Sequence, residues 1–426
     1  MSEEAFGKRD LSGIRKRKIL AYIFFGFKKI VNLVKTRTQI SKFLVYPEVS
    51  NKKQLIKIIN KLLWAIPYKK GLDITIPISF NFNRDELLDV EKVEYQENYL
   101  DRNSEHIKFC DPKTIKFSKF DSILITDKSK LFKFSILKNI SKIDIIDETY
   151  YSSVESNVWK KIYYNVFPKG EIEKFKKISL ANFSSLLKRN KTKASAYCFV
   201  TGPSFDRYKE IKYKRNSFKV VCNSIVKNEE FLAFIGGPDI IVFADPVFHF
   251  SPSKYSAEFR KKLIKVVNKY DCFVAVPFET FPILLTHYKE LKSRLIGFSF
   301  QNKFNIPKEN NVSVKKSSNI LTLLMIPIAS SVSGQIFIIG ADGRKKGEKY
   351  FWKHSGSVQF TDLMETAFRC HPSFFRDRIY DKYYKHHCKF LGKLLEYGEK
   401  RGKEYYSLTN SYIDVLRKRT KGTVLK

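Results

Sequence analysis

The chain has 426 residues, and its 79 lysines and arginines outnumber its 43 aspartates and glutamates, which gives a formal charge of +36. Hydrophobic residues make up 43% of the chain and aromatic residues 15%, enough for a packed core, so a wholly disordered protein is excluded. The six cysteines form no CxxC pair, which argues against a disulfide framework or a thiolate zinc site and favours a reducing cytoplasm.

The positive charge points to acidic partners: nucleic acid, an anionic membrane surface, or nucleotide and sugar-acid substrates. An AT-rich genome is a second explanation, because the chain is also rich in Lys, Ile, Phe, Asn and Tyr. We find neither a zinc-finger spacing nor an RNP-type aromatic motif, so we expect no nucleic-acid partner.

The first residues contain a short apolar run between basic clusters. Residues 19–27 are apolar or small, and they lie between the basic residues 15–18 and Lys28-Lys29. This run is shorter than the ~20 apolar residues that span a bilayer. One interpretation is a basic amphipathic helix on the anionic inner membrane, which predicts a cytoplasmic, peripheral protein; the other is an ordinary helix packed on the body of the protein.

Residues 1–190 form an N-terminal region of unknown role. Residues 54–66 (QLIKIINKLLWAI) have the apolar spacing of a helix, and residues 72–82 (LDITIPISFNF) alternate like a strand. The charged residues 188–193 (KRNKTK) indicate a linker, so we predict a second domain at 191–426.

From residue 194 on, short apolar runs alternate with helical stretches and end in small or polar residues. The predicted strands are 197–200, 218–222, 240–243, 272–276 and 335–339. An apolar helix over 319–331 has Ser317 and Ser318 as candidate caps. The alternation predicts an α/β fold with a Rossmann-like, mostly parallel sheet flanked by helices, and ligands bind at the carboxyl ends of such strands.

Three of these strand ends carry candidate binding residues. Gly202-Pro203-Ser204 offers N–H groups, a hydroxyl and a helix N-terminus that suit a phosphate or ribose, although such turns are also common in purely structural roles. Asn223 is suited to a base or sugar, or equally to capping a turn. Asp245 resembles a metal-binding acid, but no DxD partner stands beside it, and we expect no metal.

Histidines supply the candidate proton acceptors. His354 follows Asp342-Gly343-Arg344 and lies among aromatic residues, where an imidazole with a near-neutral pKa is suited to removing a proton from a hydroxyl. A structural or surface role is the alternative for His354, and His371 is a second candidate. His386-His387-Cys388 lacks the HExxH spacing of a zinc site.

The order of these motifs resembles that of the bacterial sialyltransferases, family 42 of the glycosyltransferases, over residues 194–416. The matches are a glycine–proline–serine turn, a cysteine–asparagine pair, a hydroxyl cluster, a glycine–X–aspartate turn, a tyrosine, a histidine–serine pair and an asparagine–serine turn. In this chain they are Gly202-Pro203-Ser204, Cys222-Asn223, Ser317-Ser318, Gly340-Ala341-Asp342, Tyr350, His354-Ser355 and Asn410-Ser411.

This resemblance implies an inverting, metal-independent transfer of a sialic, nonulosonic or Kdo-type sugar from a CMP donor to a glycan or lipid-linked acceptor, in surface polysaccharide or lipooligosaccharide synthesis. It implies no cofactor besides the CMP-sugar substrate. His354 would be the general base, with Arg344 and Tyr350 beside the leaving phosphate. Gly202, Pro203, Ser204, Asn223, Ser317, Ser318, Gly340 and Asp342 would frame the nucleotide, and Asp245, Ser355, His371 and Asn410 would be accessory.

The chain also departs from that family. Arg344 stands where the family has a phosphate-side tyrosine, and the segment between the tyrosine and the histidine is much shorter. A pterin pyrophosphokinase group and flagellin-modifying transferases share the glycine–proline–serine turn. The alternative functions are therefore a nucleotide-dependent pyrophosphokinase of the pterin type and a non-catalytic basic protein that binds nucleic acid or an acidic polymer.

Overall fold

The protein is described by a computed structural model with two compact units. The structure describes residues 16, 39–66, 71–81, 106–127, 129–130, 139–146, 155–345, 355–371 and 380–420. The first unit comprises Met1–Ile172, Pro246–Ala257 and Leu363–Arg378, and the second comprises Glu173–Asp245, Glu258–Asp362 and Ile379–Lys426. The predicted basic helix near residues 19–27 lies outside the described residues.

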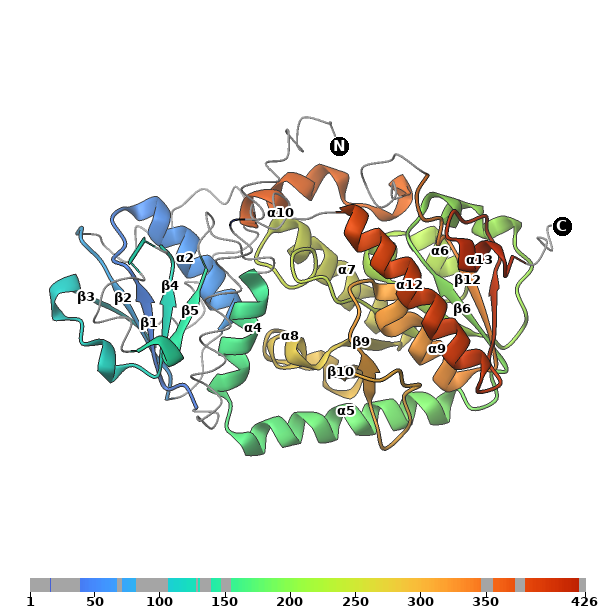
Figure 1. Cartoon of the computed structure of the whole chain (residues 1–426), viewed down its shortest axis with the longest axis horizontal. Helices are drawn as coiled ribbons and strands as arrows, with labels where there is room; N and C mark the ends of the chain where they lie inside the picture. The colour runs from blue at the N-terminus through green and yellow to red at the C-terminus, as the bar shows by residue number, and fades with distance from the viewer. Residues whose placement is uncertain are drawn as a thin grey trace. The chain divides into compact units, whose positions relative to one another are not determined.

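A five-stranded parallel sheet in the order β3-β2-β1-β4-β5 forms the centre of the first unit. Its strands are β1 Lys42–Tyr46, β2 Asp73–Pro77, β3 Ile107–Cys110, β4 Ser122–Ile125 and β5 Ile143–Ile145. Figure 1 labels them, together with helices α2 (Lys52–Ala65) and α4 (Glu155–Val166), which contact each other. Helix α2 confirms the helix predicted at 54–66. Strand β2 confirms the strand predicted at 72–82, although it is shorter than predicted.

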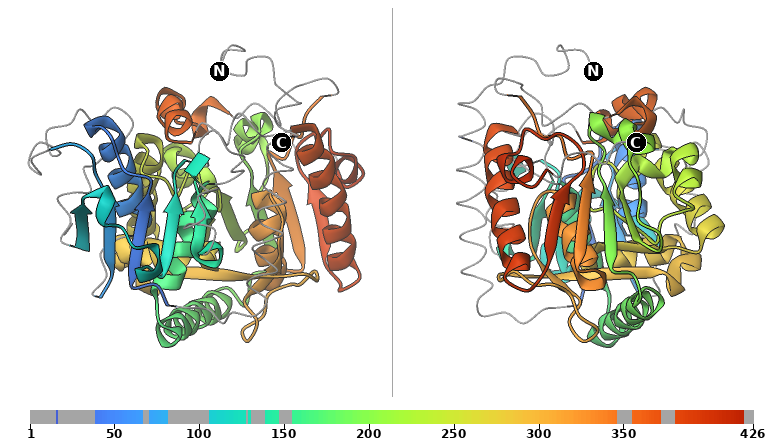
Figure 2. Two further views of the ribbon diagram at one scale, coloured as in Figure 1. Left: turned by 60° about the vertical axis from the view of Figure 1, so that its left-hand side comes forward. Right: turned by 90° about the vertical axis from the view of Figure 1, so that its right-hand side faces the viewer.

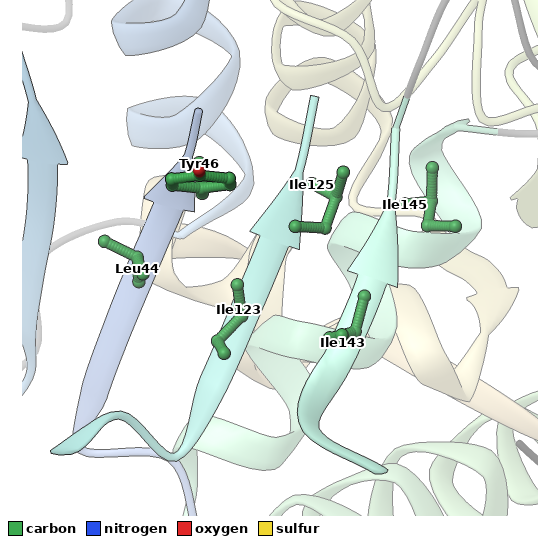
Figure 3. Packing of buried hydrophobic residues seen from close by; sticks show 6 residues of the cluster. All are labelled: Leu44, Tyr46, Ile123, Ile125, Ile143 and Ile145. Carbon is green, nitrogen blue, oxygen red and sulfur yellow. The ribbon is translucent and has the colours of Figure 1, made fainter. Parts of the chain in front are cut away.

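Branched aliphatic side chains from the middle of this sheet form its core. Leu44, Ile123 and Ile143 are fully buried, and Tyr46, Ile125 and Ile145 extend the same cluster along the three neighbouring strands (Figure 3). The cluster follows from the side-chain period of two, because every second residue of a strand faces the same side of the sheet.

The second unit contains an eight-stranded sheet in the order β11-β10-β9-β8-β7-β6-β12-β13, and every pairing between these strands is parallel. The strands are β6 Ser195–Phe199, β7 Phe218–Cys222, β8 Ile240–Val242, β9 Phe273–Pro277, β10 Leu295–Gln301, β11 Ser313–Lys315, β12 Gln335–Ile339 and β13 Glu404–Ser407. Two of the predicted strands, 218–222 and 335–339, are confirmed at both ends, and the other three shift by one or two residues.

Helices flank this sheet (Figure 2), as the predicted α/β, Rossmann-like class requires. Helix α9 (Ile326–Val332) packs against β6 and β12, and α12 (Tyr380–Glu399) packs against β13. Other helices that contribute to the unit are α6 Glu229–Phe234, α7 Lys254–Tyr270, α8 Phe281–His287 and α13 Asp414–Arg417.

Helix α5 (Lys169–Arg189) includes the first two residues of the predicted linker at 188–193. The Ser179 hydroxyl donates to the Gly297 carbonyl oxygen at 2.8 Å, and the Asn182 amide donates to Leu295 at 2.8 Å, so α5 is tied to β10. Lys188 and Arg189 belong to this helix. We predicted a domain boundary at 190/191, whereas the compact units divide at Ile172, ahead of these contacts.

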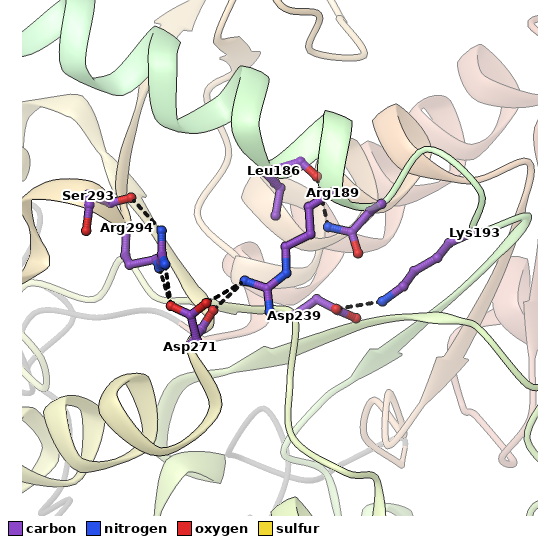
Figure 4. Close-up of polar contacts among 8 residues, drawn as sticks. Leu186, Arg189, Lys193, Asp239, Asp271, Ser293 and Arg294 are labelled. Carbon is purple, nitrogen blue, oxygen red and sulfur yellow. Dashed lines mark hydrogen bonds and ion pairs between the residues drawn. The ribbon is translucent and has the colours of Figure 1, made fainter.

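Ion pairs connect the end of α5 and the turn before β6 to the residues that precede β8, β9 and β10 (Figure 4). Asp271 accepts from Arg189 and Arg294, and Lys193 lies 2.6 Å from the Asp239 carboxylate. The Lys193–Asp239 pair is mostly buried, with side chains 15% and 14% exposed, and Asp239 also accepts the Lys219 backbone N–H at 2.8 Å. Such additional hydrogen bonds offset the cost of removing the charges from water.

Candidate functional site

The second sheet reverses its direction of growth between β6 and β12. From β6 the chain adds β7, β8, β9, β10 and β11 on one side, and then β12 and β13 on the other. Because the connections on either side of this point run in opposite directions, a crevice is expected outside the carboxyl ends of β6 and β12. The predicted motifs Gly202-Pro203-Ser204 and Gly340-Ala341-Asp342 follow these two strands directly.

Two glycines allow the turns after these strands to touch. The Gly202 N–H donates to the Gly340 carbonyl oxygen at 2.9 Å. A Cβ at Gly202 would lie 2.2 Å from an Asp342 carboxylate oxygen and 2.4 Å from the Gly340 oxygen, and one at Gly340 would lie 2.2 Å from the Val200 carbonyl oxygen. Gly340 also has φ +77°, a conformation that L side chains rarely adopt. Glycine is therefore required at both positions by close approach.

Asp342 joins the two turns through Ser204. The Ser204 hydroxyl donates to the Asp342 carboxylate at 2.9 Å, and the Ser204 N–H lies 3.2 Å from both carboxylate oxygens. Burial raises the pKa of Asp342 above its usual range, and the hydrogen bonds from Ser204 offset only part of this effect. The site therefore holds a partly desolvated carboxylate at the strand reversal.

These bonds change the expected role of the Gly202-Pro203-Ser204 turn. The N–H groups of Gly202 and Ser204 are engaged within the protein, and Pro203 has none. The turn opens a helix, as expected, and this helix is a 3₁₀ helix, Pro203–Glu210. The Asp342 carboxylate beside this turn is an acceptor for hydroxyl or amino groups.

Arg344 lies two residues beyond Asp342 with a side chain only 10% exposed. Its guanidinium pairs with Asp381 and lies over the Tyr384 ring, 4.9 Å from the ring centroid. Burial raises the pKa of Tyr384 to about 12. Arg344 is thus held in one orientation by α12, close to the glycine–X–aspartate turn.

The other predicted nucleotide-binding residues follow neighbouring elements. Asn223 comes directly after β7 with φ +51°, as expected of an asparagine in a tight turn. The helix predicted at 319–331 begins as a π-helix, Leu321–Met325, and continues as α9. Neither Ser317 nor Ser318 caps it, which corrects our prediction: the Asn319 side chain accepts the Leu321 N–H at 2.9 Å instead.

Ser317 and Ser318 contact other residues of the second unit. The Ser317 hydroxyl lies 2.9 Å from that of Thr322, and the Ser318 carbonyl oxygen accepts the Tyr383 hydroxyl. The contact between Ser318 and Tyr383 connects this serine pair to α12, the helix that also contacts Arg344.

The accessory candidates divide between the two units. Asp245 is half-buried beyond the end of β8, and Asn410 is exposed in the turn after β13. His371 is buried at the end of α10 (Met364–Cys370) in the first unit, so it belongs to a different compact unit from the β6 and β12 turns. His387 is buried in α12, and burial lowers its pKa to about 3.

Two of the predicted catalytic residues, Tyr350 and His354, lie outside the described residues. The Ser355 N–H donates to the Thr201 carbonyl oxygen at 3.3 Å, just after β6. Ser355, which is 4% exposed, is therefore attached to the first of the two turns.

Sequence reasoning missed several residues that support these turns. Thr409 accepts the Gly340 N–H at 3.0 Å, and the Ser411 hydroxyl donates to the Ala341 carbonyl oxygen at 2.7 Å. The Tyr412 N–H donates to the Asp342 carbonyl oxygen at 2.7 Å. The asparagine–serine turn at 410–411 was a signal for this region, but it pointed to a ligand rather than to support of the glycine–X–aspartate turn.

Comparisons with known proteins add no family to this picture: no family model, curated protein or solved structure matches the chain. Within the described ranges, no group of three His, Cys, Asp or Glu side chains could hold a metal ion. No helix among the described residues has both the length and the apolar character needed to cross a bilayer.

Proposed function

We propose that this protein is an inverting, metal-independent glycosyltransferase that moves a sialic, nonulosonic or Kdo-type sugar from a CMP donor to a glycan or lipid-linked acceptor. The observation that supports it best is the contact of the two motif-bearing turns at the β6–β12 reversal. Gly202, Ser204, Gly340 and Asp342 are joined there by hydrogen bonds, although 136 residues or more separate the two motifs along the chain.

The Asp342 carboxylate is suited to the nucleoside part of such a donor. Carboxylates accept hydrogen bonds from ribose hydroxyls in dinucleotide-binding sheets of this kind. Asn223, at the end of the adjacent strand, would complete the frame.

The proposed reaction forms a bond from the acceptor oxygen to the anomeric carbon and breaks the bond from that carbon to the phosphate oxygen. The electron pair of the broken bond leaves with CMP, and the proton of the acceptor hydroxyl passes to His354. General-base catalysis of this kind contributes about 10²–10⁴-fold. Arg344 and Tyr350 would stabilise the departing phosphate, since donors aimed at developing charge contribute strongly in a partly buried site.

The net charge of +36 fits an acidic donor and an acceptor that is presented at an anionic bilayer. We therefore place the enzyme in the cytoplasm, peripheral on the inner membrane, in surface polysaccharide or lipooligosaccharide synthesis. This part of the proposal depends on charge alone.

Ligand-dependent melting tests the nucleotide first. CMP should raise the melting temperature of the full chain and ATP–Mg²⁺ should not, because only a ligand of the native state stabilises it. Stabilisation by ATP–Mg²⁺ instead would favour the pyrophosphokinase, and DNA binding with a steep salt dependence would favour the non-catalytic basic protein.

Transfer is tested with a panel of CMP-sugars, followed by mass spectrometry of released CMP. His354→Ala should lose transfer and keep CMP binding, while His386→Ala, which removes an exposed imidazole from α12, should retain both. A fully active His354→Ala variant would remove the general base from the mechanism.

A further inference from the structure

Helix α12 carries a row of lysines along its outer face. Lys382, Lys385, Lys389 and Lys393 are spaced by three or four residues, so they lie on one face of the helix over about 16 Å. All four side chains are exposed. Figures 1 and 2 show α12, in red, on the outside of the second unit. We call these four residues the lysine row.

The opposite face of α12 is apolar and packed. It includes the buried side chains of Leu391, Leu394 and Leu395, and the helix contacts β13, α13 and the π-helix Leu321–Met325. The apolar side chains of α12 are therefore used in the core of the second unit. The lysine row meets a partner through charge rather than by inserting apolar side chains.

The charge of the lysine row is not neutralised by neighbouring side chains. No described residue forms an ion pair with any of its members. In helix α7, by contrast, Lys262 and Lys265 both pair with Glu229. Like charges three or four residues apart destabilise a helix, so the row is unfavourable for folding and points to a role outside the fold.

The acidic residues of α12 offset little of this charge. Asp381 pairs with Arg344, and Glu399 pairs with Arg419. Glu396, which is exposed, is the remaining acidic residue of the helix. The outer face of α12 is therefore strongly positive.

We propose that the lysine row is the surface by which this protein binds an anionic membrane. A straight, convex helix face matches a flat bilayer, and each lysine close to such a surface strengthens binding about 5-fold. Lysine is a compact point charge on a flexible stem, which suits the diffuse charge of a bilayer. Recognition of individual phosphates in a nucleic acid favours the planar fork of arginine, and α12 contains no arginine.

The lysine row begins beside the candidate site. At the N-terminal end of α12 the Tyr383 hydroxyl donates to the Ser318 carbonyl oxygen, and Asp381 pairs with Arg344. A bilayer along α12 would therefore adjoin the carboxyl edge of the second sheet, where a lipid-linked acceptor is needed. This link to the acceptor rests on the proposed function, whereas membrane binding by the lysine row does not.

Sedimentation with vesicles tests the lysine row in the full chain. The row variant carries Lys382→Gln, Lys385→Gln, Lys389→Gln and Lys393→Gln. The matched control carries the same change at four exposed lysines of the second unit outside α12, namely Lys174, Lys177, Lys261 and Lys289. With vesicles of phosphatidylcholine and phosphatidylglycerol in 0.1 M salt, we expect the row variant to bind at least about 100-fold more weakly than the wild type. The control should lose less than about 5-fold, because charges beyond a Debye length of about 10 Å are screened.

Salt, melting and DNA binding complete the test. The difference between the wild type and the row variant should vanish in 1 M salt, where the Debye length is about 3 Å. The row variant should melt no lower than the wild type, because it loses like-charge repulsion within α12. Equal vesicle binding by the wild type and the row variant, or an equal loss in the control, would overturn the proposal. Loss of DNA binding with vesicle binding intact would overturn it in favour of a nucleic-acid surface.

Transfer assays separate this inference from the proposed function. The row variant should hydrolyse a CMP-sugar in solution like the wild type and transfer less sugar to a lipid-linked acceptor in anionic vesicles. A protein that transfers no sugar but binds vesicles through the lysine row would overturn the glycosyltransferase and keep the membrane surface. Unchanged transfer to the lipid-linked acceptor by a row variant that no longer binds vesicles would overturn the link to the acceptor.

Discussion

Gly202→Ala perturbs the contact between the two turns with the smallest chemical change. Gly202 has φ −68°, so alanine adopts its backbone conformation without strain, and the effect is purely steric. The new Cβ would lie 2.4 Å from the Gly340 carbonyl oxygen, which is 0.6 Å inside the 3.0 Å limit below which real Cβ atoms essentially do not come. A backbone oxygen cannot rotate away, so the turns after β6 and β12 must separate.

The same Cβ would lie 2.2 Å from an Asp342 carboxylate oxygen, so that side chain must also move and weaken its bonds to Ser204. Overpacking of this kind costs about 1–3 kcal/mol, and weakening a partly buried charge-assisted hydrogen bond adds ~1 kcal/mol or more. For a unit of this size, a loss of about 3 kcal/mol lowers the melting temperature by roughly 6–12 °C.

Thermal unfolding by circular dichroism and CMP binding by calorimetry measure the two consequences of Gly202→Ala. Gly334→Ala is the matched control, because Gly334 immediately precedes β12 and a Cβ there meets nothing within 4 Å. We expect Gly202→Ala to lose both stability and CMP affinity and Gly334→Ala to lose neither. A Gly202→Ala protein that melts and binds CMP like the wild type would refute the close contact of the turns and the site built on it.

Three further predictions concern charge. Asp342→Asn keeps an acceptor for Ser204 and should stabilise the fold by up to about 1 kcal/mol at neutral pH. The pKa of Asp342 is raised in the folded protein, so the stability gained by Asp342→Asn should disappear as pH falls through that pKa, as measured by melting at several pH values. A stability gain that does not depend on pH would contradict the raised pKa of Asp342. Arg344→Ala should lower turnover by ~10²-fold, and it should also lower the melting temperature because the Arg344 side chain is only 10% exposed and packs over the Tyr384 ring; unchanged kinetics would remove Arg344 from the site. Deleting residues 1–34 should reduce sedimentation with anionic vesicles, and equal sedimentation would favour a packed helix.

The strands at the centre of the second sheet could be predicted because they are buried on both faces. β7 and β12 are mostly apolar, with Lys219 and Gln335 as their polar residues, and they are followed by Asn223 and Gly340; mostly apolar runs of this kind are typical of parallel strands. β10 contains Gly297 and polar residues at its end, and β11 has only three residues, so neither gave a clear pattern. In the first unit β3, β4 and β5 are only three or four residues long, and none of them was predicted.

Helix α5 escaped prediction for a different reason. It is tied to the sheet partly by polar side chains, since Ser179 and Asn182 hydrogen-bond to the backbone of β10. A helix that docks in this way has a weak apolar stripe, and periodicity alone does not reveal its packed face. The charged residues at its end then suggested a linker, although Arg189 and Lys193 form ion pairs with Asp271 and Asp239.

The order of the strands places the motifs at 202 and 342 next to each other. It does not predict the hydrogen bonds that support these two turns. Whether Asp206 binds Ser355 and Ser357, and whether Thr409 receives the Gly340 N–H, depends on segments that are distant along the chain. Local patterns specify turns and strand ends, whereas these partners are chosen by the tertiary structure.

The charge of Asp342 is the feature of the two turns that the proposed function would explain. The bonds from Ser204 require only an acceptor oxygen, which asparagine would also supply, and burial makes the ionised carboxylate unfavourable for the fold. The negative charge of Asp342 therefore lowers the stability of the fold at neutral pH. The hydrogen bonds with Ser204 do not require this charge. A group that is unfavourable for folding and lies at the carboxyl edge of a parallel sheet, where the strand order reverses, is well placed to bind the hydroxyl or amino groups of a ligand.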